Sequence, residues 1–178
     1  MASLSIKSFS RLFHESFYIY QNYFALDPQT YSYYFAVNSA FAILGPVLYI
    51  RSIGSISARS FAWSCLLIVI ASSISVFIVG VQSPFFFMLT FLPFTLIEGA
   101  IRPFSTNILL DQQSEDIGSA SSLINAVHTI LGSIGMLLGS LAWSNIVHGL
   151  GVIMLAASVI ATIIFVLLLR SSFKIKGL

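Results

Sequence analysis

The stretch GLGVIMLAASVIATIIFVLLL, residues 149–169, contains no charged residue and decides the fold class. A helix needs about 20 predominantly apolar residues to cross roughly 30 Å of hydrocarbon, and this stretch is long enough. Four similar runs precede it, at residues 31–50, 61–80, 84–110 and 119–143. Because lipid offers no hydrogen-bond partners to the backbone, each run must be helical. The sequence therefore predicts an all-α, polytopic transmembrane helical bundle with five full spans, over residues 31–178.

The charged residues predict how this bundle is oriented. The chain is 57% hydrophobic and only 8% charged, whereas about a quarter of the residues in a soluble domain are charged. If the runs cross the membrane alternately, seven of the eight cations share one side. These are Lys7, Arg11, Arg51, Arg59, Arg170, Lys174 and Lys176. Cation-rich loops face the cytoplasm, so we expect a multi-pass protein of the cytoplasmic (inner) membrane with a cytoplasmic C-terminus.

Residues 1–30 differ from the rest of the chain. The aromatic-rich stretch 12–26 would form about 22 Å of helix, which is too short to span the bilayer. It is either an interfacial helix or the remaining end of a truncated span. Asp27 and Pro28 end it, and Thr30 is the expected N-cap of the first full span. Residues 1–30 are thus predicted to form a truncated or interfacial helix and an outer loop.

The third run contains the polar residues of greatest interest. Glu98 and Arg102 are four residues apart, so they lie on one helix face and can pair. One interpretation is an ion pair that only stabilises the structure. The other is a carboxylate that faces a cavity and meets substrate or protons. We expect Glu98, Arg102 and Asn107 to line a substrate or proton pathway, with Asn38 of the first run as a weaker candidate.

The fourth run carries a stripe of small and polar residues at helical spacing, which differs from the featureless second and fifth runs that are expected to face lipid. The stripe consists of Asn125, His128, Gly132, Gly135 and Gly139. Gly135 and Gly139 form a small-xxx-small pattern of the kind that lets two helices approach closely in lipid. The stripe is therefore predicted to be a helix-packing interface. Within it, His128 either forms an interhelical hydrogen bond or takes part in a proton relay.

The sequence contains no pattern that indicates an enzyme. It has no HExxH, no GxSxG and no phosphate-binding loop, and it has no His, Cys and carboxylate cluster at metal-ligand spacing. The single cysteine, Cys65, excludes an internal disulfide. We expect neither an enzyme nor a bound cofactor or metal, and no nucleic-acid partner.

Two segments resemble a known family. Residues 16–38 include SFYIYQ, FALDPQTYS and FAVN, and residues 118–123 read GSASSL. The first segment resembles the connection between the seventh and eighth helices of the Bcr/CflA drug/proton antiporters, which belong to the major facilitator superfamily. The second is similar to the start of the eleventh helix in that family.

This resemblance implies that the five spans correspond to helices eight to twelve of a twelve-helix transporter. The chain would be the C-terminal half, a fragment or split subunit, of a multidrug-type secondary transporter. Such a protein exports small amphipathic compounds in exchange for protons, across a site between two six-helix halves. The expected partners are lipid, an N-terminal half or a second copy, small amphipathic substrates and protons. The alternatives are a membrane scaffold or regulatory subunit that does not transport, or a decayed remnant.

Overall fold

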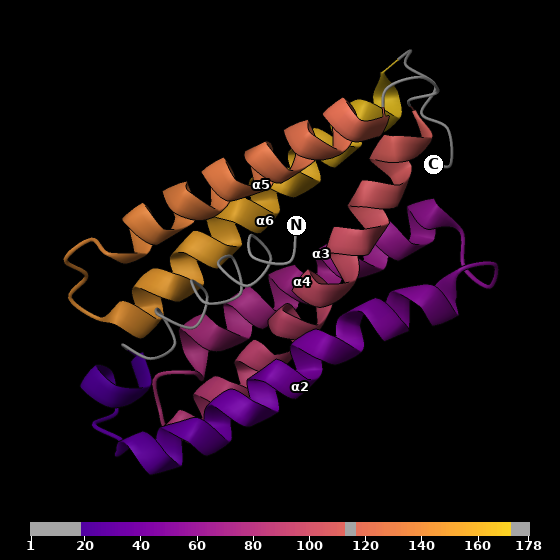
Figure 1. Cartoon of the computed structure of the whole chain (residues 1–178). Coiled ribbons are helices and arrows are strands. Elements are labelled where there is room, and N and C mark those ends of the chain that lie inside the picture. Colours follow the sequence, from indigo (N-terminus) through magenta and orange to yellow (C-terminus); the bar gives the residue numbers. More distant parts are fainter. Residues whose placement is uncertain (1–18, 113–116, 172–178) are drawn as a thin grey trace.

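Five long helices form the protein in a computed structural model that describes residues 19–112 and 117–171 (Figure 1). A short π-helical turn, η1 (Ile19–Tyr23), precedes them. The helices are α2 (Pro28–Ser52), α3 (Ala58–Ile78), α4 (Pro84–Asp111), α5 (Ile117–Gly139) and α6 (Ile146–Arg170). All five are long and apolar enough to cross a membrane. The predicted fold class, an all-α polytopic bundle, is confirmed, and the chain is an integral multi-pass membrane protein.

Four of these helices begin at a side chain that caps their free backbone N–H groups. The caps are Asp27, Ser57, Ser83 and Asn145, for α2, α3, α4 and α6 respectively. At the start of α2, Asp27 Oδ2 accepts a hydrogen bond from the Thr30 backbone N–H at 2.9 Å. The prediction that Thr30 is the N-cap is therefore wrong, and α2 begins three residues earlier than expected. A carboxylate is a favourable cap because it also complements the positive end of the helix dipole.

Helix α4 packs most closely against α2, and two glycines make this approach possible. A Cβ atom at Gly45 would lie 2.6 Å from the backbone nitrogen of Ala100, and one at Gly99 would clash with the carbonyl oxygen of Ala42. Only glycine fits at both positions. This backbone contact is of the kind expected between helices in lipid. There the association depends on van der Waals packing, and small residues let the two backbones approach closely. The sequence pattern did not indicate it, because the two glycines lie on different helices.

The bundle has a cluster of buried apolar residues toward each of its ends. One cluster joins η1 to the neighbouring ends of α3, α4 and α6; it consists of Ile19, Tyr20, Val76, Phe87, Phe91, Val147 and Met154. The second joins α2, α3 and α4; it consists of Tyr49, Phe61, Ala62, Cys65, Ile97, Ala100 and Phe104. The Tyr20 ring stacks on Tyr34 with centroids 5.1 Å apart. The described part of residues 1–30 is thus packed into the bundle, while residues 1–18 lie outside the described residues.

The helices differ in how much of their surface the bundle covers. Helix α3 packs against both α4 and α6 and buries seven residues, among them Cys65 and Val76. The expectation that the second run faces lipid stays a prediction, because α3 buries one face against α4 and α6 while apolar residues such as Leu67 and Ile78 are exposed. Helix α5 lies beside α6 on the side away from α2 (Figure 1), and its most apolar part has no buried residue. It is the most loosely packed of the five helices.

Candidate functional site

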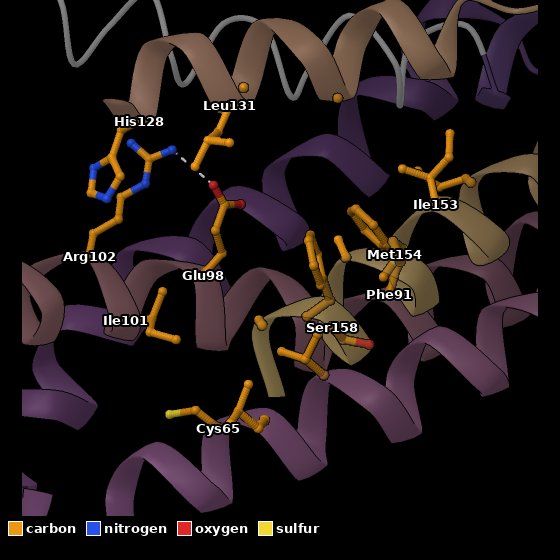
Figure 2. A pocket seen from close by; sticks show the side chains of 18 of the residues that line it. Cys65, Phe91, Glu98, Ile101, Arg102, His128, Leu131, Ile153, Met154 and Ser158 are labelled. Carbon is orange, nitrogen blue, oxygen red and sulfur yellow. Dashed lines mark hydrogen bonds and ion pairs between the residues drawn. The ribbon is translucent and has the colours of Figure 1, made fainter. Parts of the chain in front are cut away.

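A pocket of about 470 Å³ lies between α3, α4, α5 and α6 (Figure 2). Its volume falls within the roughly 300–1,000 Å³ of small-molecule sites. Most of its lining is apolar and includes Phe91 of α4 and Met154 of α6. The pocket lies where α5 packs only loosely against α4 and α6.

An ion pair faces this pocket from α4. Arg102 Nη2 donates to Glu98 Oε1 at 2.9 Å, within one helix and four residues apart. The predicted pairing of these two residues is confirmed. The Glu98 side chain is 25% exposed and that of Arg102 is 44% exposed, so neither is enclosed by the bundle. Both line the pocket, and the pair therefore provides its polar end.

His128 reaches the same end of the pocket from α5. Figure 2 shows its ring on the side of the pocket where Arg102 lies, and both residues line the pocket. A cation, a carboxylate and an imidazole from two helices thus converge at one place. For His128, the interhelical hydrogen bond and the proton relay both stay predictions.

The glycine stripe of α5 forms a wall of the pocket. His128, Gly132 and Gly135 all line it, and apart from the adjoining backbone of α5, no heavy atom of the described residues lies within 4 Å of where a Cβ atom would stand at Gly132 or Gly135. Within the described chain, these two glycines therefore leave open space instead of making a close helix contact. Asn125 is exposed, and Gly139 is the last residue of α5. Packing of the stripe against another protein stays a prediction.

The two predicted asparagines lie away from the pocket: Asn107 lies at the contact between α4 and α2, and Asn38 lies within α2. Asn107 Nδ2 of α4 donates to Tyr49 Oη of α2 at 3.1 Å. Asn38 is buried and donates from Nδ2 to the Tyr34 carbonyl at 3.2 Å. The structure therefore brings Glu98 and Arg102 together but leaves Asn107 and Asn38 as contacts within and between helices.

Several pocket residues were not predicted from the sequence. Met154, Ala157 and Ser158 of α6 line the pocket, although the fifth run was expected to face lipid. Cys65 lines it from α3. The one signal in the sequence is the spacing of Ala157 and Ala161, small residues four apart on one face of α6.

Comparison of the chain with protein-family models, with curated proteins and with solved structures gave no match.

Proposed function

We propose that this chain is the C-terminal half of a proton-coupled, multidrug-type secondary transporter, of the drug/proton antiporter class that its sequence resembles. The observation that carries the proposal is the pocket between α3, α4, α5 and α6 with the Glu98–Arg102 pair at one end. Its substrates are small amphipathic compounds. The membrane is the cytoplasmic (inner) membrane, with the cation-rich loops on the cytoplasmic side.

The ion pair lies within a helix that is long and apolar enough to span the membrane, α4. On insertion scales a charged residue at the centre of a transmembrane helix costs about 2.5–3.5 kcal/mol, and such residues generally face a cavity or a path. Here both members of the pair face a cavity. A carboxylate that can exchange between an arginine, a proton and a substrate is the group that coupled transport requires. The apolar remainder of the pocket suits the hydrocarbon part of an amphipathic compound.

The single five-span bundle argues for a partner in transport. Alternating access is largely the rocking of one bundle of helices against another around a site between them. We therefore expect the purified chain to catalyse no efflux by itself, and measurable efflux by the chain alone in proteoliposomes would contradict the proposal. The partner is an N-terminal half of about six spans, or a second copy of this chain.

The test is a co-expression experiment with the N-terminal half. The coding DNA upstream of Met1 is first read in all frames for about six further spans, and both halves are then expressed together. Efflux from cells of two fluorescent amphiphiles, cationic ethidium and an anionic dodecanoate derivative, is measured with and without a proton gradient. The double substitution Glu98→Gln with Arg102→Gln removes the charges while keeping the polar volume. Arg59→Gln is the matched control, because Arg59 is an exposed cation on α3 that does not line the pocket.

The expected result is proton-dependent efflux that the double substitution abolishes and Arg59→Gln leaves unchanged. If the double variant loses accumulation in the membrane, the pair is structural and a scaffold or regulatory subunit becomes the better explanation. If the double variant accumulates and transports normally, the pair does not lie on the transport path, and the proposal fails.

A further inference from the structure

The polar end of the pocket offers more hydrogen-bond donors than acceptors. A guanidinium has five N–H donors, and one of those on Arg102 is used by Glu98. The described residues provide no other hydrogen-bond partner for the Arg102 side chain. Only one oxygen of Glu98 accepts from Arg102. The His128 imidazole of α5 brings a further ring nitrogen to this end of the pocket. An acceptor-rich ligand group would satisfy the donors that remain.

From this balance, we propose that the pocket binds a single-chain amphiphile with an anionic headgroup. The carboxylate or phosphate contacts the free edge of the Arg102 guanidinium beside His128, and the hydrocarbon chain lies along Gly132 and Gly135. This inference rests on the proposed function, because it names the substrate class of the same pocket.

The remainder of the pocket is suited to a hydrocarbon chain. The two hydroxyl groups that line it are satisfied within their own helices: Ser158 donates to the Leu155 carbonyl at 2.8 Å, and Thr129 donates to the Asn125 carbonyl at 2.9 Å. The glycine wall adds no side chain, so a flexible chain can lie directly against the α5 backbone. Polarity is thus concentrated at one end, which is the pattern that an amphiphile matches.

The charges favour an anion over a cation at this end. A cationic headgroup would approach the Arg102 guanidinium, which is more exposed than its Glu98 partner. An anionic headgroup would approach the guanidinium directly and can form paired, charge-assisted hydrogen bonds with its planar fork. Arg102 also lies nine residues, or about 14 Å of helix, from the last residue of α4. Arg51 and Arg170 end α2 and α6 at this same end of the bundle, and basic residues there attract anionic amphiphiles.

The size of the pocket favours a ligand with one hydrocarbon chain over a ligand with two. A volume of about 470 Å³ is that of a drug-sized ligand, and a two-chain phospholipid is larger. A free fatty acid or an alkyl phosphate therefore fits, whereas a phospholipid would leave one chain outside the pocket.

The experiment compares two ligands that have the same dodecyl hydrocarbon chain and headgroups of opposite charge. The full chain, purified in a neutral maltoside detergent, is titrated with dodecyl phosphate or with dodecyltrimethylammonium, and bound ligand is counted by native mass spectrometry. Dodecanoate and phosphatidylglycerol serve as further arms, to separate single-chain anions from a phospholipid. We expect one dodecyl phosphate per chain, bound at least tenfold more tightly than the ammonium compound.

Two variants give results of opposite sign for the two charge classes. For an anionic ligand, Arg102→Gln weakens binding roughly tenfold or more, and Glu98→Gln strengthens it because the carboxylate no longer competes for Arg102. Gly135→Leu fills the pocket and weakens binding of any chain. Arg102→Lys keeps the charge in case Arg102→Gln fails to fold, and Arg59→Gln is the control that leaves binding unchanged.

Each of the other outcomes overturns the inference. Tighter binding of the ammonium compound, with loss of binding in Glu98→Gln, would identify a cationic ligand. Tighter binding of phosphatidylglycerol, unaffected by Gly135→Leu, would identify a surface lipid site. Absence of saturable binding would remove the ligand from this pocket. None of these results depends on efflux, so failure of this inference is distinguishable from failure of the transporter proposal.

Discussion

The glycines at the α2–α4 contact and those of the α5 stripe have opposite surroundings. At Gly45 and Gly99 a Cβ atom would collide with the backbone of the facing helix, whereas at Gly132 and Gly135 it would meet no described atom within 4 Å apart from the adjoining backbone of α5. The first pair lies on two helices and forms no pattern along the sequence. The second lies on one helix at regular spacing. The regularly spaced glycines of α5 therefore border open space, whereas Gly45 and Gly99, which follow no sequence pattern, lie at a close contact between two helices.

This difference shows what a small-residue pattern does and does not determine. Small residues permit close approach of helices in lipid, but packing of the neighbouring side chains decides whether approach occurs. At α2–α4, aromatic contacts accompany the glycines; for example, Tyr49 and Phe104 meet edge to face with centroids 5.8 Å apart. At α5 the facing helix presents Glu98 and Arg102, whose charges favour an open, polar space over close packing.

The largest expected effect comes from alanine substitutions at these glycines. Gly99→Ala should lower the free energy of unfolding by about 3 kcal/mol, the upper end of the range for overpacking, because the added methyl group meets backbone that cannot move aside. Gly135→Ala should raise it by up to about 1 kcal/mol, since alanine favours the helix more than glycine does. Unfolding of the purified variants in a mild detergent, followed by tryptophan fluorescence during denaturant titration, measures both.

A third glycine provides an intermediate control for this comparison. A Cβ atom at Gly151 of α6 would lie 3.0 Å from Cβ of Phe77, so Gly151→Ala requires only a small shift and should fall between the other two variants. Equal stability of the Gly99→Ala and Gly135→Ala proteins would show that the two environments do not differ as described.

The next largest effect is expected from breaking the Glu98–Arg102 ion pair at the open pocket beside α5. Arg102→Gln leaves the Glu98 carboxylate unpaired within a span and should lower the free energy of unfolding by about 2 kcal/mol. The double variant, in which Glu98→Gln is added, should recover most of this loss, because no unpaired charge remains. The same denaturant titration checks both variants. A double variant that is no more stable than Arg102→Gln would show that unpaired charge is not the cause.

The sequence predicted the helices well because hydrophobic length and backbone hydrogen bonding act locally. The five runs, and the pairing of Glu98 with Arg102 at helical spacing, follow from residues close together in the chain. The surroundings of Asn107 and Gly99 depend on which helix lies opposite, and no local pattern encodes that choice. The burial of one face of α3 was not predicted for the same reason, because its buried face and its exposed face are both largely apolar.

A smaller effect is expected at the polar contact between α2 and α4. Asn107→Leu removes the hydrogen bond to Tyr49 Oη and should lower the free energy of unfolding by about 1 kcal/mol. Tyr49→Phe removes the same bond from the other side, so the two substitutions together should cost less than the sum of each alone. A double-mutant cycle measures this coupling. Additive effects would mean that the two side chains act independently.

The smallest effect concerns the cap that begins α2, and it depends on pH. The backbone and side-chain hydrogen bonds from Thr30 lower the pKa of Asp27 below its usual 3.8. A carboxyl group whose pKa is lower in the folded protein stabilises the fold above its unfolded pKa, and this contribution is lost as the pH falls through the folded pKa. The melting temperature of the unmodified chain should therefore decrease more than that of Asp27→Asn when the pH is lowered below about 4. Because asparagine caps a helix without titrating, parallel curves for the two proteins would show that the charge of Asp27 contributes nothing to holding α2 in place.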